Sequence, residues 1–226
     1  MEDKRNIGQL FDAIAGSYDK LNHLLSLSID KRWRRKAAGC LAHKSEHLLD
    51  VAIGTADLSI EILRQHKAEH ITGIDLSEQM MAIGKRKAGE RPIDFLKVSA
   101  LDMPFEDESF DAVTCGFGVR NFSNLDKGLK EMYRVLKTGG ELVILEFSYP
   151  QNKFVAWVYD LYFSHILPLI GGALSNNRKA YRYLNTSVKN FVWGEQMASR
   201  LRTAGFDKVQ IMPLTLGIAT VYKTTK

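Results

Sequence analysis

The chain has 226 residues, of which 45% are apolar and 25% are charged, with a formal net charge of +5 at pH 7. These are ordinary values for a globular protein, and they exclude a disordered or collagen-like chain. The positive charge suits an anionic partner such as nucleic acid or a lipid surface, but it equally suits a protein without one.

The first 45 residues are expected to be helical. The opening sequence MEDKRNIGQL carries charges where a secretory signal needs an apolar core, which predicts a cytoplasmic protein. Helical spacing runs from Ile7 to about Leu41, and Ser28 is a candidate N-cap for a helix through the basic run at 31–36. Tyr18 is a secondary candidate for a functional role, in which it closes over a ligand; the alternative is that it packs in the core.

From residue 46 onward, short apolar runs alternate with helical stretches, which is typical of a parallel sheet covered by helices. The strands are expected at residues 47–53, 70–76, 92–98, 110–116 and 141–147, with a turn at 137–140 before the fifth. The helices are expected at 57–66, 77–87, near 125–136, and at 195–204, where Gly205 ends the last one. Residues 208–214 and 217–223 predict an antiparallel hairpin at a sheet edge.

An insertion from about 151 to 191 precedes the last helix. Its longest apolar segment, residues 154–170, contains Asp160 and His165 and is too short to cross a membrane. Apolar residues recur at helical spacing, and we expect this stripe to line a substrate channel, to lie at a membrane interface or simply to pack on the sheet. The stripe comprises Phe154, Trp157, Leu161, Tyr162 and Leu169, and the nearby basic residues are Arg178, Lys179 and Arg182.

These elements predict a single α/β domain with a Rossmann-like sheet, mostly parallel with an antiparallel final hairpin, and helices on both faces. Its parts are an N-terminal helical cap (1–45), a ligand-binding core (46–150), a helical insertion for substrate (151–193) and a final helix with the hairpin (194–226). Cys40 and Cys115 lack metal-ligand spacing, so we expect reduced thiols and no metal.

The stretch LLDVAIGTADLS, residues 48–59, ends an apolar strand at Gly54 and leads into a helix. In a doubly wound sheet this turn borders the ligand, because glycine admits backbone contact and the next helix offers free N–H groups. A dinucleotide site requires GxGxxG, but this stretch supplies a single glycine. The sequence therefore gives little support to a pyrophosphate site.

S-adenosylmethionine is an alternative ligand for the same edge, since it is a nucleoside that carries a positive charge and no phosphate. Asp50 at the first strand end can attract that charge. Asp75 at the second strand end can accept the ribose hydroxyls. Asp102, in the loop 98–102 after the third strand, is a candidate partner for the adenine amine.

Five motifs carry a family resemblance, and they lie in the expected order. The segments LLDVAIGTADLS, GIDLS, VSALDMPF, SFDAVTCGFGVRNF and RVLKTGGELVILEF resemble a class I S-adenosylmethionine-dependent methyltransferase from residue 46 to 147. More narrowly, YDKLNHLLSLSIDKRW at 18–33, with FGVRN and RVLKTGG, is similar to the ubiquinone/menaquinone biosynthesis C-methyltransferase family. The resemblance implies that S-adenosylmethionine is consumed and S-adenosylhomocysteine is released.

Within that resemblance, the positions that match the family's cofactor contacts are Thr55, Asp75, Ser99, Ala100 and Gly116, where the last replaces a frequent serine. The first loop departs from the family pattern. Ile53 replaces a small residue and Ala56 replaces a glycine, so their side chains narrow the turn, and Ala56 is tolerated if its φ is negative.

The resemblance also implies methylation of a ring carbon of a prenylated quinol. We expect demethylmenaquinol as the acceptor, with a benzoquinol as the alternative, and we expect peripheral membrane contact; self-association is left open. Arg120 and Asn121 follow the fourth strand and are predicted to hold a developing phenolate. The alternative is that Arg120 pairs with an acid and Asn121 caps the next helix.

A nucleic-acid methyltransferase is the main rival within this fold. It would use a Pro-Pro pair after the fourth strand or a nucleophilic cysteine after proline, and neither is present, so no nucleic-acid partner is expected. A non-enzymatic module would bind the cofactor without turnover.

Overall fold

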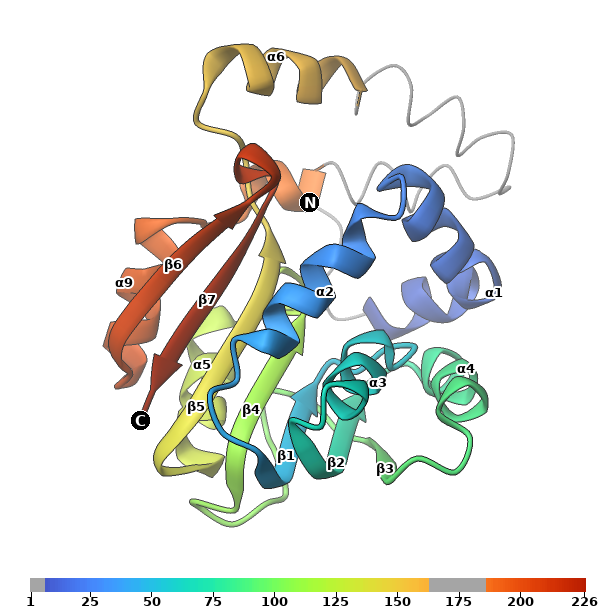
Figure 1. Ribbon diagram of the computed structural model, residues 1–226, viewed down its shortest axis with the longest axis vertical. Coiled ribbons are helices and arrows are strands. Elements are labelled where there is room, and N and C mark those ends of the chain that lie inside the picture. The colour runs from blue at the N-terminus through green and yellow to red at the C-terminus, as the bar shows by residue number, and fades with distance from the viewer. Residues whose placement is uncertain (1–6, 163–185) are drawn as a thin grey trace.

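The computed structural model describes residues 7–162 and 186–226. Their strands form one sheet in the order β3-β2-β1-β4-β5-β7-β6 (Figure 1). The first five pair in parallel, and β7 lies antiparallel to both β5 and β6, so the expected fold class is confirmed. The strands are β1 (Ser45–Val51), β2 (Ala68–Asp75), β3 (Ile93–Lys97), β4 (Phe110–Gly116), β5 (Leu136–Phe147), β6 (Asp207–Leu214) and β7 (Ala219–Thr225).

Helices cover both faces of the sheet. Figure 1 shows α2 and α3 in front of the strands and α5 and α9 behind them. The helices are α1 (Ile7–Leu25), α2 (Ile29–Gly39), α3 (Asp57–Arg64), α4 (Glu78–Ala88), α5 (Leu125–Val135), α6 (Lys153–Leu161) and α9 (Glu195–Ala204). Gly205 ends α9 with a φ of 114°, as its position in the sequence predicts.

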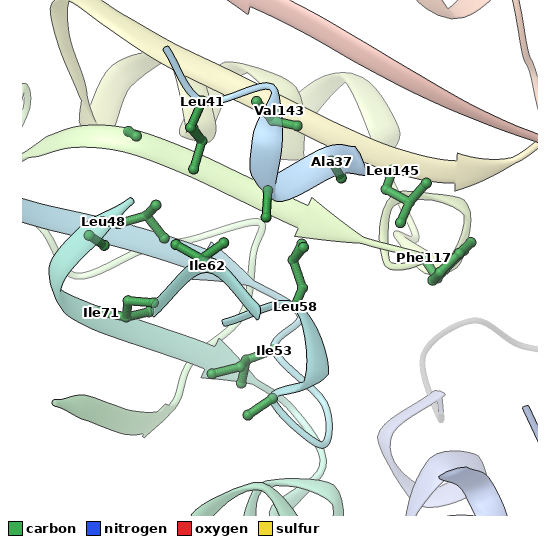
Figure 2. Close-up of a cluster of buried hydrophobic side chains, with 14 of the residues drawn as sticks. Ala37, Leu41, Leu48, Ile53, Leu58, Ile62, Ile71, Phe117, Val143 and Leu145 are labelled. Carbon is green, nitrogen blue, oxygen red and sulfur yellow. The ribbon is translucent and has the colours of Figure 1, made fainter. Parts of the chain in front are cut away.

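The apolar run in β1 is continuous because both of its faces are buried. Leu48 belongs to the core cluster under α2 and α3, which Figure 2 shows, whereas Leu49 and Val51 belong to the cluster under α5 and α9. Each of these side chains is fully buried and contributes about 2 kcal/mol through burial. This central strand therefore presents a rigid carboxyl end to the turn that follows it.

Helix α2 begins at Ile29, so Ser28 is its N-cap residue as predicted, but the cap lacks the expected side-chain hydrogen bond. Leu27 and Ser28 both lie in the left-handed region, with φ of 51° and 59°, and the Ser28 side chain makes no capping hydrogen bond. In this conformation the hydroxyl does not face the first N–H groups of α2. Ser26 instead donates its hydroxyl to Asp30 Oδ1 at 2.6 Å.

The turn expected at 137–140 is wrong, because these residues belong to β5. The pairing with β4 shifts register between Phe110 and Ala112, which leaves the four residues as an irregular stretch inside the strand. Gly139, with a φ of 80°, donates its N–H to the Lys226 carbonyl at 2.9 Å. The chain end thus supplies a partner that local sequence does not indicate.

No helix within residues 7–162 and 186–226 is both long and apolar enough to span a membrane. The expected apolar stripe of the insertion begins on α6, which Figure 1 shows beyond the carboxyl end of β5. The predictions for Leu169, Arg178, Lys179 and Arg182 concern residues outside the described part of the chain.

Candidate cofactor and active site

A cavity of about 180 Å³ lies beyond the carboxyl ends of β1, β2, β3 and β4. Its lining includes six of the residues predicted for the site, namely Gly54, Asp75, Ser99, Ala100, Gly116 and Asn121. Tyr18, the weaker candidate, lines it as well. The other four predicted residues, Asp50, Thr55, Asp102 and Arg120, are not part of this lining.

Gly54 and Asp75 form the centre of the site. Gly54 has a φ of 54°, and its N–H donates to Asp75 Oδ2 at 2.8 Å. The other carboxylate oxygen accepts the Ser77 N–H at 2.9 Å. Burial raises the pKa of Asp75 above its ordinary value, although these N–H groups oppose the shift. The carboxyl group is thus held in one orientation at the cavity wall.

Asp50 lies one layer deeper. Its carboxylate accepts hydrogen bonds from the hydroxyls of Ser59 and, at 2.8 Å, Thr114. Burial raises the pKa of Asp50 to about 6. From this position Asp50 acts on a ligand through its charge and not by contact.

Thr55 and Asp102 have other surroundings. The Thr55 hydroxyl donates to Asp19 of α1 at 2.7 Å and is buried. Asp102 is exposed and forms an isolated backbone bridge with Ser99. The structure therefore places Thr55 between the turn and α1, and Asp102 outside the cavity.

The condition for tolerating Ala56 in the turn, a negative φ, is not met. Ala56 has a φ of 64°, because the turn closes with its N–H donating to the Ile53 carbonyl at 2.9 Å. A left-handed conformation costs a residue with a Cβ atom about 1–2 kcal/mol. The same turn places Ala52 at a φ of 57°. The turn is therefore strained at two positions beside the cavity, as is common at ligand sites.

The charge of the cavity favours a cationic ligand over a phosphate. Among the described residues that line it, Asp75 is the one charged side chain, and no lysine, arginine or histidine takes part. The carboxylate suits ribose hydroxyls, and Gly54 leaves room for a nucleoside, so this donor set fits S-adenosylmethionine. A larger open groove of about 660 Å³ lies near His47 and Phe110, at the amino ends of β1 and β4 and away from the turn.

Helix α1 closes the cavity, a contribution that the sequence indicates only at Tyr18. Gly8 and Phe11 also line the cavity. Asp12 accepts a hydrogen bond from the Ser77 hydroxyl, and Asp19 pairs with Lys87 Nζ at 2.6 Å. The helical spacing of Phe11 and Tyr18 places them on one face of α1, but nothing local indicates what that face covers.

Arg120 and Asn121 separate in the structure. Asn121 lines the cavity, whereas Arg120 is buried and pairs with Glu146 at 2.9 Å. The cap of α5 is Asn124, whose side chain accepts the Lys127 N–H at 3.0 Å, so Asn121 is not the cap. The acid-paired alternative for Arg120 is therefore what the structure contains.

Comparisons with known proteins agree with this geometry. A family model described as the ubiE/COQ5 methyltransferase family matches residues 1–226. A Bacteroides fragilis protein named demethylmenaquinone methyltransferase is 43% identical, over 97% of this chain and 92% of its own. A Geotalea daltonii protein named ubiquinone/menaquinone biosynthesis C-methyltransferase UbiE is also 43% identical, over 100% and 98%. A crystal structure of a SAM-dependent methyltransferase from Thermotoga maritima matches with a TM-score of 0.68 and 21% identity, over 96% and 99%.

Proposed function

Because the chain belongs to the ubiE/COQ5 methyltransferase family, we propose that it transfers a methyl group from S-adenosylmethionine to a ring carbon of a prenylated quinol. The observation that carries this proposal is the cavity at the glycine turn, where Asp75 is the one charged side chain among the described lining residues. Such a lining accommodates a cationic nucleoside and repels a pyrophosphate. The names of the relatives favour demethylmenaquinol as the acceptor, with a benzoquinol as the alternative.

The proposed roles of the site residues follow from their places in the cavity. Asp75 accepts the ribose hydroxyls, Gly54 admits the nucleoside, and Ser99 with Ala100 borders the adenine. Asp50 favours the cationic cofactor from behind the turn through Coulomb attraction. Thr55 and Asp102 do not line the cavity, and we keep them as proposed cofactor contacts at its edge.

The bound cofactor supplies an electrophilic methyl group. Loss of a proton from a quinol hydroxyl raises the electron density at the adjacent ring carbon, which attacks that methyl group. The carbon–carbon bond forms as the carbon–sulfur bond breaks, the ring proton leaves to solvent, and S-adenosylhomocysteine is released. The Asn121 amide lines the cavity and donates toward the quinol oxygen, and alignment of the reactants supplies about 7–11 kcal/mol of the barrier reduction.

The acceptor can be tested directly with the purified chain and radiolabelled methyl donor. Demethylmenaquinol, a demethylated benzoquinol and unmodified RNA are offered in parallel, and the products are identified by mass spectrometry. We expect label on the naphthoquinol ring carbon. Label on the benzoquinol alone would establish the alternative, label on RNA alone would establish the nucleic-acid rival, and no transfer in any arm would refute the proposal.

We also propose that α6 contacts the bilayer that holds a prenylated acceptor. Its Tyr159 is buried, whereas Phe154 and Trp157 are 70% and 61% exposed, with their rings stacked 6.2 Å apart. Exposed aromatic side chains on one helix are typical of an interfacial anchor, and the net charge of +5 favours anionic lipids.

A vesicle assay tests this contact. Trp157→Ser should release the chain from anionic vesicles in co-sedimentation, whereas Leu96→Ser, at an exposed apolar residue of the edge strand β3, should not. Equal sedimentation of Trp157→Ser and the unchanged chain would contradict the contact, and loss of self-association instead would assign the surface to a second copy of the chain.

A further inference from the structure

The segment after β4 forms one wall of the cavity, with Arg120 turned into the protein. Gly116, Phe117, Gly118, Asn121, Phe122 and Ser123 all line the cavity. Arg120 is 4% exposed and is not part of this lining. Because its guanidinium group is buried, Arg120 interacts with neighbouring protein groups and not directly with the cavity.

One neighbour of Arg120 is Phe117, a residue of the wall with a strained backbone. Phe117 has a φ of 58°, a conformation that residues with a side chain rarely adopt. Its N–H donates to the Leu145 carbonyl at 2.7 Å. Its carbonyl accepts from Arg120 Nη1 and, at 3.4 Å, from Asn121 Nδ2. Two side chains of the same segment therefore hold this carbonyl in place.

Glu146 holds Arg120 in turn. This β5 residue is fully buried, and its Oε1 lies 2.9 Å from Arg120 Nη1. Its Oε2 accepts the Arg120 backbone N–H at 3.2 Å, and its Oε1 also accepts the Phe147 N–H at 2.8 Å. The carboxylate is thus tied to the strand and to both ends of Arg120, which makes a rigid brace between β5 and the wall.

The ring of Phe117 is braced as well. It packs against the Phe147 ring at a centroid distance of 4.5 Å, and Arg120 Cζ lies 5.3 Å from the centroid of Phe147. From the α2 side, Arg34 Cζ lies 5.4 Å from the Phe117 centroid. Phe147 therefore links the ring of Phe117 to the guanidinium group that holds the Phe117 carbonyl.

We propose that Glu146 and Arg120 are positioning residues for the methyl transfer, an inference that rests on the proposed function. The pair holds Phe117 in its left-handed conformation and so fixes the part of the cavity wall that carries the Asn121 amide. Arg120 acts through these groups and does not contact the quinol oxygen. A buried ion pair is weak evidence for a gain in stability, so the role that we assign to this pair is geometric.

The variant Glu146→Gln tests the brace, because it keeps the size and one acceptor oxygen but removes the charge. We expect kcat to fall about tenfold to a hundredfold while the KM for the quinol changes less than about threefold, since the quinol is still bound but is no longer aligned. The matched control is Glu141→Gln, on the same strand and paired with Lys223 at 2.7 Å, but not at the cavity. A wild-type kcat in folded Glu146→Gln would overturn the proposal.

A double variant separates positioning from direct contact. Arg120→Gln combined with Glu146→Gln removes both charges and leaves no unpaired buried ion. We expect a lower kcat with an unchanged acidic limb in the pH profile of kcat/KM. A shift of that limb by about one pH unit or more toward higher pH would instead show that Arg120 stabilises the ionised acceptor, and would overturn the proposal.

Cofactor affinity provides a readout that does not need the acceptor. Because residues 116–118 border the cavity, Glu146→Gln should weaken S-adenosylhomocysteine binding roughly threefold to tenfold in calorimetry, and Glu141→Gln should leave it unchanged. If the unchanged chain methylates no quinol, the proposed function fails, while this difference still tests the brace. Equal S-adenosylhomocysteine affinities in Glu146→Gln and Glu141→Gln would refute the proposed brace.

Discussion

At the residue scale, Ile53 stands where the family has a small residue in the glycine turn, and β2 provides the space for its larger side chain. A Cβ atom added to Gly73 would lie 2.1 Å from Ile53 Cδ1 and 3.1 Å from its Cβ. The buried Ile53 side chain therefore occupies the space that a side chain at position 73 would need. The larger residue in the turn is accommodated because the neighbouring strand has a glycine opposite it.

This pairing predicts coupled stability changes. Gly73→Ala should lower the free energy of unfolding by about 1–3 kcal/mol, because the added methyl group overpacks the core. In an Ile53→Ala background the same change should cost less than about 1 kcal/mol, since the obstructing side chain is gone. Urea unfolding of the two single variants and the double variant measures the coupling. Additive effects would show that the two positions are independent.

Asp75 carries the second residue-scale prediction. Asp75→Asn removes the charge and should weaken cofactor binding at least about tenfold, because a hydrogen bond to a charged group contributes roughly 1.5–3 kcal/mol. Isothermal titration with S-adenosylmethionine measures the affinity. Asp94→Asn, on the adjacent strand and paired with exposed His70, makes the same chemical change and should have no effect. Equal affinities in the two variants would remove Asp75 from the site.

At the element scale, the sequence indicates most of the fold because periodicity and caps are local. The parallel strands, the final hairpin and the end of α9 at Gly205 all agree with the pattern. The two departures, the missing side-chain cap at Ser28 and the strand at 137–140, have distant causes. The first depends on the path between α1 and α2, and the second on pairing with the chain end.

The site divides in the same way. Strand-end residues such as Gly54 and Asp75 are predictable, because parallel strands place their carboxyl ends together. The burial of Arg120 is not, since its partner Glu146 lies on another strand and no local pattern joins them. The contribution of α1 also depends on tertiary contacts, made through Asp12 and Asp19.

Helix α1 should control cofactor exchange. The cavity of about 180 Å³ is smaller than the 300 Å³ or more of common ligand pockets, and α1 lines it, so we expect α1 to shift outward when a cofactor enters or leaves. The connection between α1 and α2 contains left-handed residues at 27 and 28. The ion pair between Asp19 and Lys87 holds α1 against α4. Asp19→Asn breaks that pair but keeps an oxygen for the Thr55 hydroxyl.

We expect Asp19→Asn to speed S-adenosylhomocysteine dissociation roughly threefold to tenfold in stopped-flow experiments. Global stability should change by less than about 1 kcal/mol, because the pair is partly exposed. The control is Asp126→Asn, which removes an ion pair with Arg200 between α5 and α9. An unchanged dissociation rate in Asp19→Asn would show that α1 does not limit exchange.

At the scale of the whole molecule, the sheet carries a buried acid at its centre. Asp50 pairs in register with Gly73 of β2 and Thr114 of β4, and it is 1% exposed. Burial raises its pKa from the ordinary 3.8 to about 6, against the hydrogen bonds from Ser59 and Thr114. The folded chain therefore holds a proton that the unfolded chain releases near pH 4, so folding is coupled to pH.

The sign of this coupling makes Asp50 destabilising above its folded pKa. Below about pH 4 the carboxyl is protonated in both states; between pH 4 and 6 the unfolded state loses its proton first, so stability falls as pH rises. A shift of about two units corresponds to roughly 3 kcal/mol. Asp50→Asn cannot ionise, so its stability relative to the unchanged chain should rise by up to about 3 kcal/mol from pH 4 to 7. Denaturant unfolding at several pH values measures the difference in stability between Asp50→Asn and the unchanged chain, with Asp207→Asn as an exposed control. If that difference does not change with pH across this range, Asp50 ionises as freely in the folded chain as in the unfolded one.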